Sequence, residues 1–172
     1  MKDAAKKTSK PAELSPAAAE KQLAGFIAKF DAKDQKRLRA ARKIWREWFP
    51  TANELVYDNY NFLVIGYCST EKATDCIGSL AAAAGLLNLN FPYVGASLPD
   101  PAKILRGSGG KNRFLRIESV HDFSRPEVKA VIDAAVKHLG TPLAKNGKGK
   151  LIIRAVVPKQ RPRRALAKWR SQ

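Results

Sequence analysis

Two kinds of apolar periodicity follow one another along this chain, and their order limits the folds that it can adopt. Apolar side chains recur at helical spacing over residues 23–30, 38–49 and 128–139, and the second stripe contains Trp45 and Trp48, both predicted to lie in the core. Between the second and third stripes the pattern is typical of strands. Because helices and sheets bury their apolar faces against each other, this order predicts an α+β fold. We expect N-terminal helices and a C-terminal helix to pack on one face of an antiparallel sheet.

The predicted helices carry ordinary start and stop signals. The first helix is expected to begin near Glu20, and Asp31 can cap a second helix over residues 32–49. Ser124 is the expected N-cap of the last helix, which Gly140 closes.

The middle of the chain predicts strands joined by tight turns. Residues 54–58 and 61–67 are rich in β-branched and aromatic residues. Residues 76–82 and 86–91 predict a second hairpin, because apolar and polar residues alternate in the second run, although the alanines of residues 81–84 favour a helix. The remaining predicted elements are a short helix over residues 101–106, a strand over residues 114–119 and a β-prone run over residues 151–157 that could add an edge strand.

Composition divides the chain into three parts. Residues 1–19 have almost nothing to bury and are predicted to be disordered, and residues 20–140 form the α+β domain. Residues 141–172 form a basic C-terminal arm, which carries ten of the 32 basic residues and no acidic residue. This arm therefore supplies more than half of the formal net charge of +17.

The charge of the arm favours a polyanionic partner, such as nucleic acid or an anionic membrane surface. A merely solubilising tail explains the same composition about as well. The residues predicted to contact nucleic acid are Lys159, Arg161, Arg163, Arg164, Lys168, Trp169 and Arg170. Such an arm can bind phosphates but has few groups that could recognise bases, so binding is expected to be independent of sequence. Binding is expected to weaken steeply with salt, and deleting residues 158–172 is expected to remove most of that salt dependence and to leave the fold of residues 20–140 intact.

A polar and aromatic cluster at a predicted strand end is the candidate ligand cleft. Hydroxyls, amides and a carboxylate are suitable groups for orienting a small ligand, although Asn and Asp equally serve the hydrogen bonds of a turn. A glycine-rich loop at residues 107–110 could cup an anion beside two arginines, and a mobile connection is the alternative. The predicted site residues, which suit a small anionic ligand, are Tyr57, Asp58, Asn59, Tyr60, Asn61, Asp100, Arg113 and Arg116.

No residues are spaced as a catalytic group, a metal site or a cofactor motif. His121 and His138 have no partner at the spacing of a nucleophile or a metal ligand. Cys68 and Cys76 are more typical of small core residues than of a redox or zinc pair, and a chain with two cysteines suits the reducing cytoplasm. No apolar run is long enough to predict a membrane span.

Several ordered motifs resemble the YdhG-like family, a domain of unknown function numbered 1801. They are LVYDNYN at residues 55–61, Gly66-Tyr67, GASLPDP at residues 95–101, LRGSG at residues 105–109 and RFLRI at residues 113–117, and the resemblance covers about residues 20–140. The resemblance implies an antiparallel sheet flanked by helices in a frataxin-like fold, and one member of the family has been described as an iron chaperone. Frataxin-like iron carriers present acidic ridges, whereas the first two predicted helices here carry more basic than acidic residues.

The sequence therefore predicts a non-enzymatic cytoplasmic binding module with a polar ligand cleft and a polyanion-binding arm. A frataxin-like iron carrier is the first alternative, and an enzyme acting on a small anionic substrate is the second.

Overall fold

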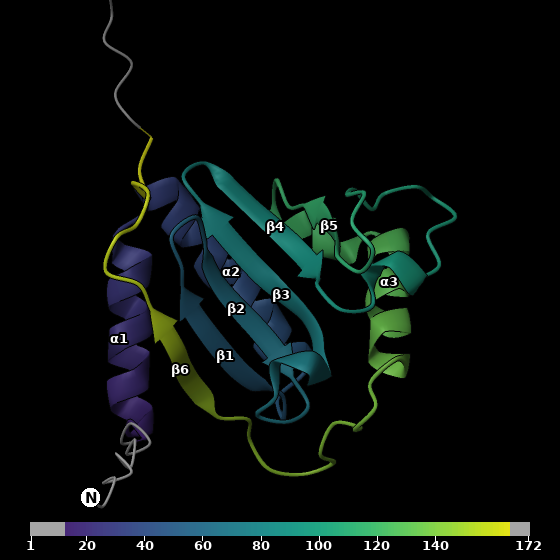
Figure 1. Ribbon diagram of the computed structural model, residues 1–172, viewed down its shortest axis with the longest axis horizontal. Helices are drawn as coiled ribbons and strands as arrows, with labels where there is room; N and C mark the ends of the chain where they lie inside the picture. The colour runs from purple at the N-terminus through teal and green to yellow at the C-terminus, as the bar shows by residue number, and fades with distance from the viewer. Residues whose placement is uncertain (1–12, 166–172) are drawn as a thin grey trace, which may run out of the picture.

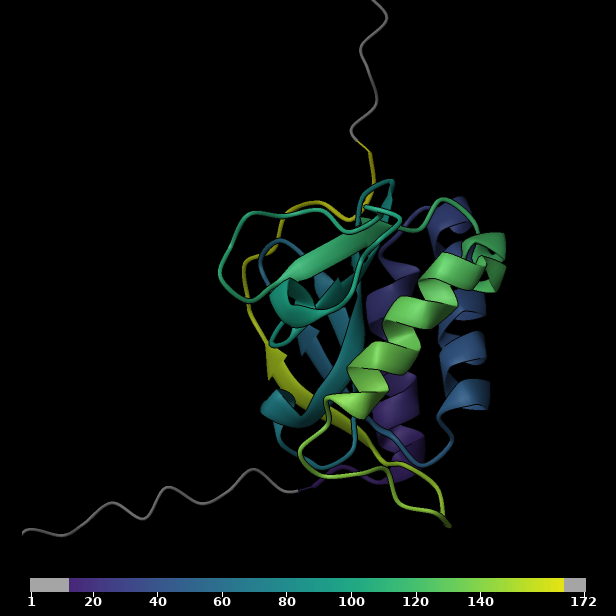
Figure 2. The same ribbon diagram turned by 90° about the vertical axis from the view of Figure 1, so that its right-hand side faces the viewer.

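Helices cover one face of a six-stranded sheet in the computed structural model, which describes residues 13–165 (Figures 1 and 2). The sheet stands in front of α2 in Figure 1, so its uncovered face is turned toward the viewer. Figure 2, a view from the side, shows the sheet and the helices as two layers. The helices are α1 (Pro16–Ala28), α2 (Ala32–Trp48) and α3 (Pro126–Lys137). The α+β class predicted from the sequence is confirmed, and so is the packing of helices from both ends of the chain on one sheet.

The sheet has the strand order β5-β4-β3-β2-β1-β6. The first five strands form an antiparallel meander, whereas the last strand pairs in parallel with β1 at the sheet edge. This parallel pairing needs a long return path, which α3 and the loop after it provide in Figure 1. The strands are β1 (Asn53–Asp58), β2 (Leu63–Cys68), β3 (Cys76–Ala83), β4 (Leu86–Phe91), β5 (Arg113–Arg116) and β6 (Leu151–Val156).

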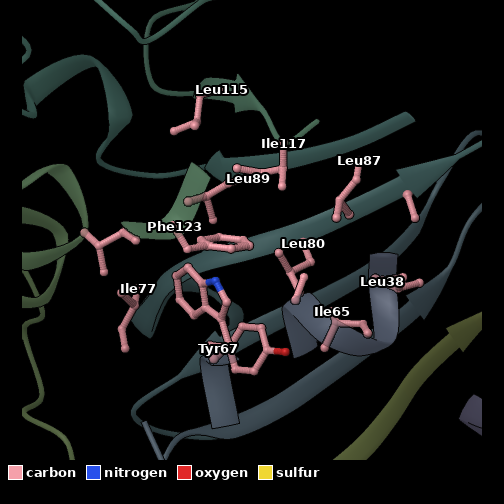
Figure 3. Packing of buried hydrophobic residues seen from close by; sticks show 14 of the residues in the cluster. Leu38, Ile65, Tyr67, Ile77, Leu80, Leu87, Leu89, Leu115, Ile117 and Phe123 are labelled. Atoms are coloured by element: carbon pink, nitrogen blue, oxygen red, sulfur yellow. The ribbon is translucent and has the colours of Figure 1, made fainter. Parts of the chain in front are cut away.

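The hydrophobic core lies between the sheet and the helices. Alternate residues of β2 and β4 point into it, and Figure 3 shows Ile65 and Tyr67 from β2 with Leu87 and Leu89 from β4. Trp45 of α2 is completely buried, as predicted, and stacks on Tyr67 with 4.8 Å between ring centroids. The alternation of period two thus gives each strand one face for the core.

The prediction that Trp48 is also a core residue is wrong. Its side chain is 38% exposed at the end of α2 and meets Phe123 edge-on, with ring centroids 6.1 Å apart. Trp48 is the last residue of α2, so its ring lies at the end of the helical layer and, among the described residues, only Phe123 makes a ring contact with it. Helical spacing defined the stripe correctly but not how far along α2 the sheet reaches.

The predicted hairpin over residues 76–91 is confirmed as β3 and β4, joined through Gly85 at φ +69°. Ala81 and Ala82 are buried on opposite faces of β3, and their strand neighbours are Asn88 and Leu87. Pairing on both sides of β3 overrides the helix propensity of the alanines.

Three predicted boundaries are wrong. Helix α1 begins at Pro16 rather than near Glu20, because Ser15 caps it by accepting a hydrogen bond from the Ala18 amide at 3.2 Å. Residues 16–19 of the predicted disordered segment are therefore helical, and residues 1–12 lie outside the described residues. Helix α3 has Arg125, not Ser124, at its N-cap position.

The predicted short helix over residues 101–106 is wrong as well. The carboxylate of Asp100 accepts hydrogen bonds from the amides of Ile104 and Leu105, both at 2.9 Å, and so closes a single turn. Arg106 then pairs with Phe114 beside the sheet edge. Asp100 therefore caps one turn, as a helix start would, but the pairing of Arg106 with Phe114 is extended and no second turn follows.

The strand β6 enters the sheet through a close backbone approach at Gly149. The Gly149 amide donates to the Pro50 carbonyl at 2.9 Å, and a Cβ atom on residue 149 would overlap the carbonyl group of Ala52. We expect Gly149→Ala to lower the free energy of unfolding by about 1 to 3 kcal/mol, the usual cost of forcing extra atoms into a packed site. Urea denaturation measures this change. Gly140→Ala is the matched control because a Cβ there meets no atom within 4 Å, and an equal loss in both variants would contradict the prediction.

Within residues 13–165, no helix combines the length and the apolar character needed to cross a membrane.

Candidate ligand-binding site

The face of the sheet that no helix covers is hollow at its centre. Leu55, Gly66, Ser79 and Asn90 are successive cross-strand neighbours on β1 to β4, and all four lie on this face. Gly66 has no side chain and Ser79 has a small one, so the middle of the row is low. Residues of the connection between β4 and β5 line its border.

This hollow has a volume of about 410 Å³. Its walls include Tyr57 from β1 and Tyr93 from the connection between β4 and β5. Apolar and uncharged polar groups alternate around it, and no charged side chain lines it among the described residues. The complete lining is Leu55, Tyr57, Val64, Gly66, Cys68, Ala73, Cys76, Ser79, Asn90, Pro92, Tyr93 and Asn112.

The two wall tyrosines are hydrogen-bond donors with aromatic faces. Burial raises the pKa of both Tyr57 and Tyr93 above the ordinary value for a phenol. Both hydroxyls therefore keep their protons at neutral pH. Together with the amides of Asn90 and Asn112, they give the hollow uncharged donors and acceptors around aromatic surfaces.

Two free cysteines close one end of the hollow. Cys68 and Cys76 are opposite each other on β2 and β3, and both are buried. Its hydrogen bond to Cys76 and its burial raise the pKa of the Cys68 thiol, and the Cys76 thiol donates to the Gly78 carbonyl at 3.0 Å. A buried thiol with a raised pKa is a poor nucleophile, so this arrangement supports the role of small core residues that the sequence favoured.

Of the predicted cluster at residues 57–61, Tyr57 alone lines the hollow. Asp58 is next in the strand and therefore points to the opposite face, where it is fully buried and forms ion pairs with Lys29 at 2.7 Å and Arg163 at 2.9 Å. Asn59, Tyr60 and Asn61 are exposed in the turn between β1 and β2. The prediction of one cleft formed by all five residues is wrong, because a strand divides its side chains between two faces.

The other predicted ligand residues bind their own surroundings. Asp100 holds the turn described above. Arg113 donates to the carbonyls of Gly109 and Asn112, so it folds over the glycine-rich loop. Arg116 pairs with Glu118 at 2.7 Å. The structure does not bring these three side chains together into an anion site.

The first part of the predicted arm is docked on the domain. The amides of Val157 and Arg161 donate to the carbonyls of Asp58 and Tyr60, at 3.0 and 2.9 Å. Arg163 is 2% exposed by side chain and is held by Asp58, so its assignment as a nucleic-acid contact is wrong.

Three other predicted contacts in the arm, Lys159, Arg161 and Arg164, are exposed. Lys168, Trp169 and Arg170 lie outside the described residues.

Sequence reasoning missed Gly66, Ser79, Asn90 and Tyr93 as site residues. The signal for two of them was present: a tight turn at Gly85 places Ser79 opposite Asn90, and both are polar residues in mostly apolar strands. Nothing local marked Tyr93, which reaches the hollow because the chain beyond β4 folds back over the sheet.

No group of three or more His, Cys, Asp or Glu side chains that could hold a metal ion occurs between residues 13 and 165. The described residues therefore offer no candidate set of ligands for the alternative of an iron carrier. Comparison with family models, with curated proteins and with solved structures found no match to this chain, so the resemblance to the YdhG-like family stays a prediction.

Proposed function

We propose that this protein is a non-enzymatic, cytoplasmic binding protein that holds a small, uncharged, ring-containing molecule in the hollow on the open face of the sheet. The observation that carries the proposal is the low floor at Gly66 and Ser79 between the aromatic walls Tyr57 and Tyr93. A volume of about 410 Å³ falls within the range of about 300 to 1,000 Å³ that small-molecule sites occupy.

The chemistry of the lining supports an uncharged ligand rather than the anion predicted from the sequence. The two tyrosines offer ring faces for stacking, and Asn90 and Asn112 offer amide donors and acceptors that fix orientation. No described side chain in the lining would compensate the charge of a buried anion. Two thiols free of disulfide bonds are consistent with a reducing compartment.

A fragment screen by ligand-observed nuclear magnetic resonance tests the proposal, with neutral and anionic planar compounds compared on the full chain. We expect neutral fragments to bind, and Gly66→Val to abolish their binding because the new side chain fills the floor. A Cβ at residue 66 meets its nearest neighbours at 3.5 Å or more, so the backbone accommodates the first atom of the new side chain, and a thermal melt of the variant checks its fold.

Tyr93→Ala should weaken the binding of the same fragments by about two- to tenfold, equivalent to the 0.5 to 1.5 kcal/mol of an aromatic pair. Tyr60→Ala is the matched control, since Tyr60 and Tyr93 are similarly exposed, at 44% and 39%, and Tyr60 does not line the hollow. Fragment binding that survives Gly66→Val, or that is restricted to anions, would contradict the proposal.

A further inference from the structure

Helix α2 presents a row of unmatched positive charges to solvent. It carries seven basic and two acidic residues within Ala32–Trp48. Three of its arginines are matched: Arg37 pairs with Asp34, and Arg42 and Arg46 pair with carboxylates on α1 and β1. The other four basic residues are exposed and follow the helical repeat; we call Lys33, Lys36, Arg39 and Lys43 the α2 basic stripe.

The stripe is almost uncompensated by nearby carboxylates. Lys43 lies 3.9 Å from Glu47, and both side chains are exposed, so this pair contributes little. Lys33, Lys36 and Arg39 form no ion pair within residues 13–165. At a helical rise of about 1.5 Å per residue, the stripe extends for about 15 Å. Duplex nucleic acid carries about one negative charge per 1.7 Å of its axis, so several phosphates can face this length.

A groove runs beside the stripe, between α1 and α2. It has a volume of about 420 Å³ and is lined by Ile27, Arg39, Arg42, Lys43, Arg46 and Glu47. Four of these six side chains are basic. The stripe residues Arg39 and Lys43 belong to this lining, where they can reach an anion seated in the groove.

The docked C-terminal segment brings another positive charge, Arg164, to the N-terminal end of α2. The Arg164 guanidinium reaches the Ala28 carbonyl at 3.4 Å, and the Ala165 amide lies 3.4 Å from the Asp31 carboxylate. Asp31 precedes α2 directly, so the described chain ends beside the start of the stripe. Figure 1 shows this segment passing along the end of α1.

We propose that the α2 basic stripe and its groove bind the phosphate backbone of a nucleic-acid duplex without reading its sequence. Three of the four stripe residues are lysines, which pair with phosphates as point charges and lack the forked donor geometry that recognises a base edge. An anionic membrane surface fits less well, because surface-bound helices insert large apolar side chains. No large apolar side chain is exposed on α2 between Lys33 and Lys43, and the exposed Trp48 lies at the far end of the helix.

The test is a salt titration of the full chain binding a random-sequence DNA duplex, followed by fluorescence anisotropy. The variant Lys33→Gln/Lys36→Gln/Arg39→Gln removes three charges and keeps good helix formers. Each phosphate contact contributes about −0.9 to the slope of log K against log salt, so the slope should become less steep by about 2.7. The same relation gives a loss of affinity on the order of a hundredfold at 0.15 M salt.

The matched control is Lys137→Gln/Lys145→Gln/Lys148→Gln, which removes three exposed charges elsewhere. We expect it to leave the slope unchanged, and both triple variants to keep the thermal midpoint of the parent. Equal slope changes in the two variants would overturn the proposal in favour of diffuse attraction by net charge. Loss of the whole slope in Lys168→Gln/Arg170→Gln would place the contact in the terminal residues instead. Binding to phosphatidylserine vesicles but not to the duplex would also overturn it.

Discussion

Replacing Asp58 with Asn should destabilise this protein by about 3 to 5 kcal/mol, the usual cost of breaking a buried ion pair from one side. Both the Asp58 carboxylate and the Arg163 guanidinium are buried, with an Nη2–Oδ1 distance of 2.9 Å. Without the carboxylate, the cation of Arg163 keeps only the Asn59 carbonyl and the face of Phe30, whose ring centroid is 5.9 Å away. Urea denaturation followed by circular dichroism measures the loss.

The same substitution should release the segment that follows β6. This segment is attached by Arg163 and by Gln160, whose side chain contacts Lys29 and the Asp58 carbonyl. Trypsin should therefore cleave after Lys159 faster in Asp58→Asn than in the parent. Removing residues 158–172 would likewise leave Asp58 without Arg163, so the expectation that this deletion leaves the fold intact does not fit the structure.

A double-mutant cycle separates the ion pair from general damage. Arg163→Met keeps much of the side-chain volume, and Asp58→Asn with Arg163→Met should cost less than the sum of the two single changes by about 1 to 3 kcal/mol. Asp133→Asn, an exposed carboxylate on α3, is the control and should change stability by no more than about 0.5 kcal/mol. Additive effects at Asp58 and Arg163 would rule out the pair as the source of stability.

Trp45→Ala should lower the free energy of unfolding by about 3 to 5 kcal/mol, because it removes the largest fully buried side chain and leaves a cavity in the core. The indole stacks on Tyr67 and tilts against Phe49, with centroids 4.8 and 5.3 Å away. It also lies against β3, where a Cβ at Gly78 would come within 3.2 Å of it. A thermal melt should show a fall in midpoint of about 6 to 20 °C.

Trp48→Ala is the matched control, made on the same helix and with the same loss of atoms. Its side chain is partly exposed and meets Phe123 by one edge, so we expect a loss of about 1 kcal/mol or less. Similar midpoints for the two variants would show that Trp45 does not anchor the helical layer to the sheet.

The sequence alone determined which parts of the chain become helices and strands where the periodic pattern is long. The stripes of α2 and α3 and the alternation along β4 each reflect burial of one face, which the order of residues encodes directly. The turn at Gly85 then aligned β3 with β4. These features depend on neighbours close in sequence, so a single sequence contains enough information to predict them.

Only the tertiary structure decided where the functional candidates lie. Tyr57 and Asp58 are adjacent in sequence, yet the strand sends one to the open hollow and the other into the core beside Arg163. In the sequence, Arg163 resembles its basic neighbours. In the structure it pairs with the carboxylate of Asp58, which lies 105 positions earlier in the chain. The same holds within α2. Arg42 pairs with carboxylates of α1 and β1, whereas the residues of the α2 basic stripe face solvent. Burial and charge pairing depend on residues that are distant in the chain, and no local sequence pattern specifies which distant residues come together.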